Sequence, residues 1–567
     1  MSGQAKILNP NQEHPGGELR SHQTQWPRPH LDPSSKVVTL GSLSRAVSEE
    51  NLCGRLAQAL GALSSKAVLL VQLVENAASL SLGACAQMLP ATHGQFRFAE
   101  QLEKGVDGYN SLTLGVTLGA EEPASLCAVL HHLRQHFGHV LLNVGRTVAA
   151  TVLMECATHS DLTYLFLGRN LDEVYHLNQF LHDIRARSTI NSSCIKAILC
   201  AGEEENTQEF RDLITQIDRP HESLAYGHST RTIYHSLLYW NDRKGRFAYD
   251  VRRLAREIAG CRIGLALSSG GAKGLAHIGV IQVLEENGIE VDVVAGCSMG
   301  AYVGSIWAYG YDGPQLEGLA RELERRWGLL HLIDPVIPPR QGFLRAARIK
   351  ARLKRSIGDA HFCDLLRPLR IVATNLDTLE RGIFSSGEIA TAVHASIAIP
   401  GVCIPVIIDG EPYVDGGTAD PLPTDVLDEM GVEHIIAVNT IPTPGYLRCS
   451  REAEREQAER AGSGPEKVKM MSQHFNYLER GNILDILLRS SHGSQMRVAE
   501  QACRYADVVI RPLTCDTKWH DFTHPGKYIA LGRRVAEERL DELKALVALK
   551  KKTHETDRSN DTMAGLA

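Results

Sequence analysis

The sequence predicts an α/β protein built around two sheets. Over residues 36–235, and again over 262–548, short apolar stretches of strand length alternate with longer stretches of helical periodicity. This alternation is typical of βαβ units, which form mostly parallel sheets flanked by helices. In addition, two glycine-rich turns each follow a strand-like stretch and precede a helix-like one, where parallel sheets place their functional sites.

The length of 567 residues leaves room for two to four domains. We expect a disordered segment over 1–35, an α/β domain over 36–235, a helical linker over 236–261, a second α/β domain over 262–548 and a disordered tail over 549–567. Within the second domain we expect a core over 262–430 and an insertion over 443–494. The insertion fits either a lid or an oligomer contact, and the sequence does not decide between them.

The first α/β domain is similar to nucleotide-binding domains of the Rossmann-like or P-loop-like type. It contains no G-x-x-x-x-G-K-[ST], so we expect a domain that lacks a P-loop and binds no nucleotide tightly. Its expected strands are 37–40, 67–71, 139–144, 164–167 and 195–199.

Composition excludes several classes of protein. The formal net charge of -6 gives no sign of nucleic-acid binding. The 13 cysteines show no C-x-x-C spacing, which favours reduced thiols and a cytoplasmic location. No apolar run reaches the roughly 18 residues of a membrane span, and residues 1–35 lack the layout of a signal peptide. Any membrane contact is therefore expected to be peripheral.

The pentapeptide 296–300, GCSMG, is the most informative motif. It follows the apolar run 291–295 and precedes the helix-like run 301–309. This is the setting of a nucleophile elbow, in which Gly296 and Gly300 permit a tight turn that presents the hydroxyl of Ser298. Ser298 is therefore a candidate nucleophile.

A second motif, 268–274, reads SSGGAKG and joins the strand-like stretch 263–267 to a helix-like stretch. Glycine-rich turns at a helix N-terminus expose backbone N–H groups that can hold a phosphate or an oxyanion. The residues concerned are Ser269, Gly270, Gly271, Ala272, Lys273 and Gly274.

A third motif, 413–417, reads YVDGG. The flanking glycines, Gly416 and Gly417, would let Asp415 approach a serine hydroxyl without crowding. Taken alone, an Asp-Gly pair favours a turn residue. With the other two motifs present, we interpret Asp415 as catalytic.

Together these motifs resemble the patatin-like phospholipase family, within it the neuropathy-target-esterase-like branch of bacterial type. The order of the motifs fits, as do the stretches 394–401 and 421–426 that flank the third one. The resemblance is strong over 262–430 and weaker to about 545. One departure is Ser269, which occupies the first glycine of the family's G-x-G-x-x-G.

The resemblance implies a serine lipid hydrolase that acts on phospholipid or lysophospholipid esters and needs no metal or cofactor. It implies a Ser298–Asp415 dyad, with the backbone N–H groups of Gly270, Gly271 and Ala272 as the oxyanion hole. A non-catalytic lipid-binding or scaffold protein is the alternative. A dinucleotide-binding oxidoreductase fits poorly, because Glu290 precedes the strand that it should end.

Four further features allow a functional and a structural reading. Lys273 either attracts an anionic head group or is a solvated lysine at a helix start. His277 is expected to pack against the sheet, and His132 with His136 to lie on the surface. Seven basic residues over 340–357 either dock an anionic membrane or form a solvated helix face.

Overall fold

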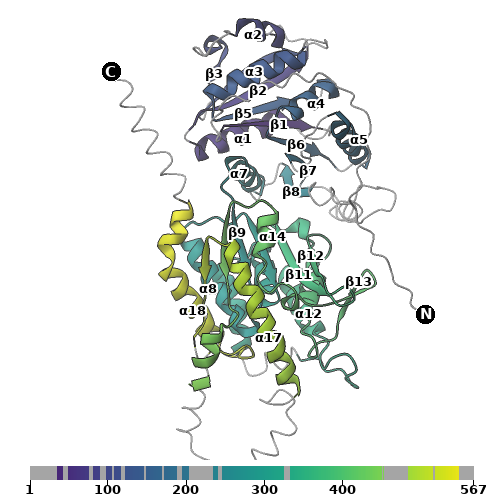
Figure 1. Cartoon of the computed structure of the whole chain (residues 1–567), viewed down its shortest axis with the longest axis vertical. Coiled ribbons are helices and arrows are strands. Elements are labelled where there is room, and N and C mark those ends of the chain that lie inside the picture. The colour runs from purple at the N-terminus through teal and green to yellow at the C-terminus, as the bar shows by residue number, and fades with distance from the viewer. Residues whose placement is uncertain are drawn as a thin grey trace, which may run out of the picture.

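The computed structural model shows two α/β domains, one above the other along the longest axis of the molecule (Figure 1). It describes residues 35–547 except 43–48, 65, 76–80, 90–97, 105–107, 117–121, 146–147, 169–170, 188–193, 203–233, 241–245, 325–332, 450, 453–482 and 515–516. The expected disordered ends, apart from Ser35, and much of the expected insertion 443–494 lie outside the described residues.

The N-terminal sheet has the strand order β3-β4-β2-β5-β1-β6-β7-β8. Every neighbouring pair is parallel except β3 with β4. The strands are β1 (Lys36–Ser42), β2 (Val68–Glu75), β3 (Glu103–Lys104), β4 (Tyr109–Val116), β5 (His139–Val144), β6 (Leu162–Leu167), β7 (Ile195–Gly202) and β8 (Tyr234–Trp240). All five expected strands are present, and β3, β4 and β8 were missed.

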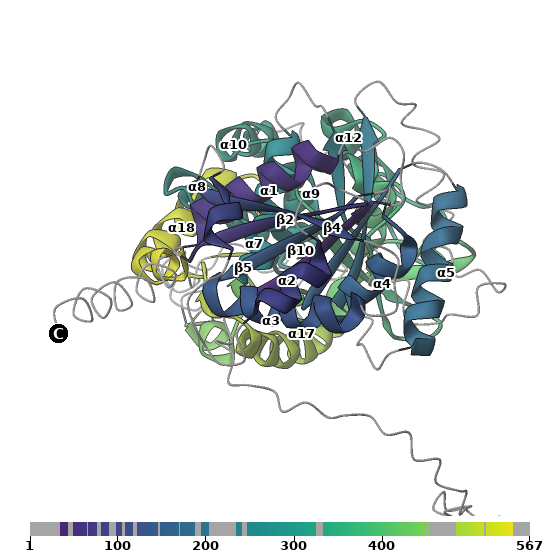
Figure 2. The ribbon, with the colours of Figure 1, turned by 90° about the horizontal axis from the view of Figure 1, so that it is seen from above.

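Both faces of this sheet are covered because neighbouring side chains of a strand point to opposite sides. Val37 of β1 packs with α2 (Leu82–Met88), α3 (Glu122–His136), α4 (Ala150–Thr158) and α5 (Leu171–Arg187). Val38 packs with α1 (Glu49–Leu63) and α7 (Arg246–Ala259) on the other side. Seen from above, α1 and α3 accordingly lie on opposite sides of β2 and β5 (Figure 2).

The expected linker helix over 236–261 is wrong in its first part. Residues 234–240, YHSLLYW, form β8 and pair with β7, and the helix begins only at Arg246. Aromatic and leucine side chains favour a strand at a sheet edge, and the pairing with β7 then decides the outcome.

The C-terminal sheet has the strand order β13-β14-β11-β10-β9-β15-β16, with β12 paired to β11. Strands β11, β10, β9, β15 and β16 run parallel to one another, whereas β12 and β14 pair antiparallel with β11 and β13 pairs antiparallel with β14. The strands are β9 (Ile263–Leu267), β10 (Val293–Cys297), β11 (Leu369–Asn375), β12 (Arg381–Phe384), β13 (Val406–Ile408), β14 (Glu411–Asp415), β15 (His434–Val438) and β16 (Val508–Ile510).

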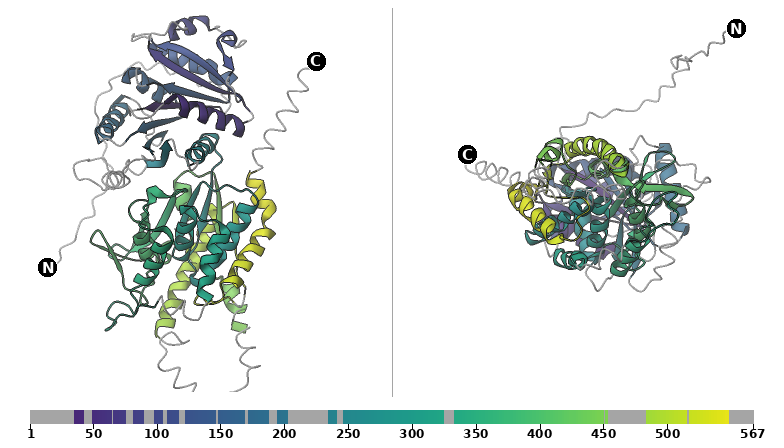
Figure 3. Two further views of the ribbon diagram at one scale, coloured as in Figure 1. Left: turned by 180° about the vertical axis from the view of Figure 1, so that it is seen from behind. Right: turned by 90° about the horizontal axis from the view of Figure 1, so that it is seen from below.

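Helices cover both faces here as well, which confirms the predicted fold class. One face packs against α8 (Ala276–Glu286), α9 (Met299–Tyr309), α10 (Gly313–Arg321), α12 (Ala347–Ile357), α13 (Ile389–Ser396) and α18 (Pro525–Glu538). The other packs against α14 (Thr424–Glu429) and α17 (Ile483–Ala502). Seen from behind, the yellow α18 and the teal α8 run side by side (Figure 3).

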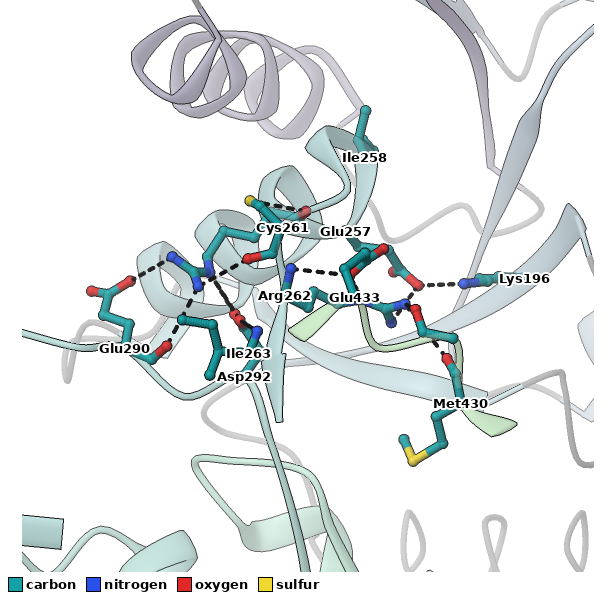
Figure 4. Close-up of polar contacts among 12 residues, drawn as sticks. Lys196, Glu257, Ile258, Cys261, Arg262, Ile263, Glu290, Asp292, Met430 and Glu433 are labelled. Carbon is teal, nitrogen blue, oxygen red and sulfur yellow. Dashed lines mark hydrogen bonds and ion pairs between the residues drawn. The ribbon is translucent and has the colours of Figure 1, made fainter. Parts of the chain in front are cut away.

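Helix α7 joins the two domains through buried ion pairs (Figure 4). Glu257 of α7 contacts Lys196 of β7 and accepts a hydrogen bond from Arg262 at 2.9 Å, and Arg262 also reaches Glu433 at 3.1 Å. The start of β9 is thereby fixed against the N-terminal domain. The carboxyl end of β9, where a functional site is expected, lies at the opposite end of the sheet (Figure 1).

Candidate active site

Ser298 occupies a sharp turn between β10 and α9, as the elbow motif predicts. Its φ of 52° and ψ of -116° are unusual for a residue with a side chain. A Cβ on Gly300 would lie 2.1 Å from the carbonyl oxygen of Leu267, so only glycine fits there. The turn is anchored by Ser396, whose hydroxyl accepts a hydrogen bond from the Ser298 N–H at 2.8 Å.

Ser298 and Asp415 form a hydrogen-bonded pair. The Ser298 hydroxyl donates to Asp415 Oδ2 at 2.6 Å, and the N–H of Gly417 donates to Oδ1 at 2.8 Å. Asp415 ends β14, and its own N–H donates to Ala398 O at 2.8 Å. The stretch 394–401 therefore holds both members of the pair. The bond between them is direct, with no histidine interposed.

Burial alters the acidity of Asp415, which is only 5% exposed. Desolvation raises its pKa to about 6, although the hydrogen bonds from Ser298 and Gly417 oppose the rise. At neutral pH the side chain is therefore a carboxylate, and it is a stronger base than an exposed aspartate. This is the property that a proton acceptor for Ser298 requires.

The glycine-rich turn lies between β9 and α8, beside the elbow. Gly271 has a φ of 57°, and a Cβ there would lie 2.4 Å from the carbonyl oxygen of Trp519. Among the described residues, no acceptor is assigned to the N–H groups of Gly270 and Gly271. Both are thus available to a ligand.

Ala272 differs from the prediction. Its N–H donates to the carbonyl oxygen of Trp519 at 2.7 Å and is not free to hold an oxyanion. The motif itself does not indicate this contact, since Trp519 is almost 250 residues away along the chain. Gly274 instead permits close packing, because a Cβ there would lie 2.5 Å from Met299. Gly416 acts likewise, with a Cβ position 2.2 Å from Val372 O.

A cavity of about 330 Å³ contains the serine, the aspartate and the glycine-rich turn. Helix α17 and the segment around Trp519 provide further walls that the motifs did not reveal. The lining residues are Ser269, Gly270, Gly271, Lys273, Ser298, Ile399, Pro400, Gly401, Asp415, Thr418, Ile441, Pro442, Ser491, His492, Gln495 and Trp519. The walls combine apolar side chains with a few polar groups, as small-molecule sites do.

Lys273 is a buried cation in this wall, not a solvated one. It is 6% exposed, and its ammonium group lies 5.8 Å from the centre of the Tyr446 ring. Burial lowers its pKa to about 8. No carboxylate contacts it among the described residues.

The structure agrees with the prediction for His277 and contradicts the one for His132. His277 is fully buried and its Nε2 lies 2.9 Å from Ser268 O, as expected for a packed residue. His132 was expected on the surface but is 6% exposed, because its ring packs edge-on against Phe98. Within the described residues, no cluster of side chains could hold a metal ion.

Three of the seven basic residues of the segment 340–357 take part in ion pairs. Arg352 contacts Glu322 at 2.9 Å, and Lys350 contacts Glu388 at 3.1 Å. Lys354 contacts Asp359 at 2.7 Å. These carboxylates neutralise the two lysines and Arg352, so these three residues of α12 do not form an open basic face.

Cysteine chemistry departs from the prediction at one position. Cys449 is disulfide-bonded, and every other described cysteine is a free thiol. Cys449 follows Tyr446 at the start of the expected insertion. Among the described helices, none has both the length and the apolar composition needed to cross a bilayer.

Comparison with known proteins gives matches for the part of the chain that contains the site. Residues 265–428 match the model of the family described as patatin-like phospholipase. An uncharacterized NTE family protein of Mycobacterium tuberculosis is 41% identical over 178 residues, which cover 31% of this chain and 49% of the relative. A lysophospholipase NTE1 of Pyricularia oryzae is 31% identical over 213 residues, 37% of this chain and 14% of the relative. The chain thus spans about half the length of the mycobacterial relative, and far less of the fungal one.

Solved structures give weaker likenesses. VipD from Legionella pneumophila is 16% identical, with a TM-score of 0.26 over 50% of this chain and 67% of VipD. A ParA family ATPase from Chlorobium tepidum is 13% identical, with a TM-score of 0.27 over 40% of this chain and 91% of the ATPase. Scores this low support no inference about this chain. The sequence matches are sufficient: residues 265–428 form a patatin-like phospholipase domain, and its homologues are NTE family proteins.

Proposed function

We propose that the protein is a serine lipid hydrolase that cleaves carboxylic esters of phospholipids or lysophospholipids with the Ser298–Asp415 dyad. The observation that carries the proposal is the 2.6 Å hydrogen bond from the Ser298 hydroxyl to Asp415 inside a cavity. The same cavity is lined by Gly270 and Gly271, whose N–H groups are available. Nucleophile, base and oxyanion donors therefore meet in one place.

In the first half-reaction, Ser298 Oγ attacks the ester carbonyl carbon while Asp415 takes the hydroxyl proton. The oxygen of the tetrahedral intermediate accepts hydrogen bonds from the N–H groups of Gly270 and Gly271. Collapse of the intermediate breaks the bond to the leaving alcohol, which receives the proton from Asp415. The product is an acyl group on Ser298 and a restored carboxylate.

Lys273 supports an anionic substrate. A buried ammonium group in the wall of the cavity, with no carboxylate beside it among the described residues, stabilises a negative charge placed nearby. A phosphodiester next to the cleaved ester supplies such a charge. We assign the head-group phosphate of the lipid to this side of the cavity.

The segment before α12 suits contact with a lipid surface, in place of α12 itself. Ile337 is 87% exposed and Phe343 is 38% exposed, and Arg340 and Arg345 beside them are exposed too. The N–H of Phe343 donates to Val402 O at 2.9 Å, next to the cavity wall at Gly401. We propose a cytoplasmic enzyme that touches membranes transiently through this segment.

The proposal is tested by Ser298→Ala and Asp415→Asn, each of which should abolish hydrolysis of p-nitrophenyl esters and of lysophospholipids. A fluorophosphonate should label the wild type at Ser298 and leave Ser298→Ala unlabelled. Activity at the wild-type level in either variant contradicts the dyad. A wild type that binds lipid but neither hydrolyses it nor reacts with the label would instead be a non-catalytic lipid-binding protein.

A further inference from the structure

A polar pocket wall surrounds Gly417, directly after the catalytic aspartate. A methyl group built on Gly417 would lie 3.0 Å from Asp415 Oδ1, 3.1 Å from Ser269 Oγ and 3.3 Å from Gln495 Nε2. These three side chains come from three separate parts of the fold: the end of β14, the glycine-rich turn and helix α17. All three side chains line the cavity, and a glycine at position 417 places no side chain between them.

These three side chains can form further hydrogen bonds. Among the described residues, no partner is assigned to the Ser269 hydroxyl or to the Gln495 amide. Asp415 Oδ1 accepts only the N–H of Gly417, although a carboxylate oxygen can accept two hydrogen bonds. Since each atom lies within 3.3 Å of the position that a Cβ of residue 417 would take, no two of them are more than about 6.4 Å apart, a span that one oxygen atom can bridge with two hydrogen bonds.

We propose that Ser269, Gln495 and Asp415 Oδ1 bind the oxygen of the acyl acceptor in the second half-reaction. That oxygen belongs to water in hydrolysis, or to an alcohol in acyl transfer. The inference rests on the proposed function, because it needs an acyl group on Ser298. It also gives a role to Ser269, the position at which this chain departs from the glycine of the family motif.

The groups present suit an attacking water. A water molecule here donates one hydrogen to Asp415 Oδ1 and the other to Ser269 Oγ, and it accepts a hydrogen bond from the amide of Gln495. One lone pair stays free to attack. Positioning of this kind is worth large rate factors, because it removes the need to find the reacting geometry during the reaction.

The reaction then balances without any further component. The water oxygen forms a bond to the acyl carbonyl carbon while Asp415 takes one water proton. The bond from that carbon to Ser298 Oγ breaks, and Asp415 returns the proton to Oγ. The products are a free fatty acid, the Ser298 hydroxyl and the Asp415 carboxylate. With an alcohol in place of water, the product is a new ester.

The test separates the two half-reactions in Ser269→Gly and Gln495→Leu, with Ser494→Ala as a matched control, since Ser494 is exposed on the same helix. Enzyme in excess over p-nitrophenyl butyrate at pH 8 reports acylation alone, through release of nitrophenolate. With substrate in excess, the steady-state rate reports the slower half-reaction. The mass of the intact protein reports how much acyl-enzyme is present. All variants should acylate within about twofold of wild type, whereas the first two should turn over about tenfold more slowly and accumulate acyl-enzyme.

Added methanol identifies the acceptor. If the site binds the oxygen of water and of methanol alike, both fatty acid and methyl ester form more slowly in the two variants. If it holds water alone, the share of methyl ester rises in them. Either result supports the site. Equal loss in both half-reactions, or no loss of turnover, overturns it. A wild type that never carries an acyl group on Ser298 refutes the proposed function itself, and so the two failures are distinguishable.

Discussion

Asp415→Asn should inactivate the enzyme and yet stabilise its fold at neutral pH. In the folded protein, burial raises the pKa of Asp415 to about 6 from the usual 3.8. A folded pKa above the unfolded value means that the folded state binds the proton more tightly. The contribution of Asp415 to the free energy of unfolding is therefore at its maximum below about pH 4 and is lost as the pH rises towards 6.

The size of the effect follows from the shift of roughly two pH units. Each unit corresponds to about 1.4 kcal/mol, so holding Asp415 as a carboxylate costs about 3 kcal/mol of folding free energy at pH 7 and above. Asparagine has nearly the same shape, carries no charge and can still accept the hydrogen bond from the Gly417 N–H. The variant should gain up to this amount at pH 8 and almost nothing at pH 4.

The assay is urea unfolding of full-length protein at several pH values, followed by tryptophan fluorescence, to which Trp307 in the core of the C-terminal domain contributes. Ser298→Ala is the control. It removes a hydrogen bond that favours the carboxylate, and so it should not stabilise the protein at pH 8. A variant Asp415→Asn that is less stable than wild type at pH 8, or equally stabilised at both pH values, would refute the reasoning.

Four further outcomes are expected. The kcat/KM of the wild type for a p-nitrophenyl ester should fall as the pH drops through about 6, because protonated Asp415 cannot take the serine proton; a flat profile from pH 4 to 8 would contradict this. Lys273→Met should lower kcat/KM for an anionic lysophospholipid about tenfold and change little for a neutral short-chain ester, and the wild-type preference should fade as the pH rises past about 8. Glu257→Ala should destabilise the protein to urea by about 3 kcal/mol, because it removes the carboxylate from the buried Lys196 and leaves Arg262 with Glu433 as its remaining ion-pair partner among the described residues; Glu290→Ala, at an exposed pair, should cost less than about 1 kcal/mol. Arg340→Glu with Arg345→Glu should weaken sedimentation with anionic vesicles, most of all at low salt, and leave hydrolysis of the short ester unchanged; unaltered sedimentation would exclude this segment as the contact.

The sequence was sufficient for features that depend on neighbouring residues. The elbow at 296–300 and the turn at 268–274 are local arrangements in which glycine is required by close backbone contacts. The buried strands of a parallel sheet read as short apolar runs, and so β9 and β10 lie close to their expected places. The order of the three motifs then implied that Ser298 and Asp415 would meet.

Features that depend on distant contacts were missed. The basic residues of α12 looked like an open charged face until Glu322 and Glu388 were seen beside them. β8 looked helical because its pairing with β7 cannot be read from its own residues. In both cases the outcome was decided by a partner that no local pattern identifies.

The same reasoning explains why half of the cavity could not be foreseen. The family motifs specify the groups that would touch the ester. The motifs are short because each combines a tight turn with a single functional side chain. The opposite wall has a different origin: Trp519 and Gln495 follow the expected insertion, and each reaches the site through one contact with a motif residue. The carbonyl oxygen of Trp519 accepts a hydrogen bond from the Ala272 N–H, and the Gln495 amide lies 3.3 Å from the Cβ position of Gly417. Changes in this wall alter which acceptor or lipid fits without disturbing the dyad. It is therefore the part of the cavity in which specificity is most easily varied.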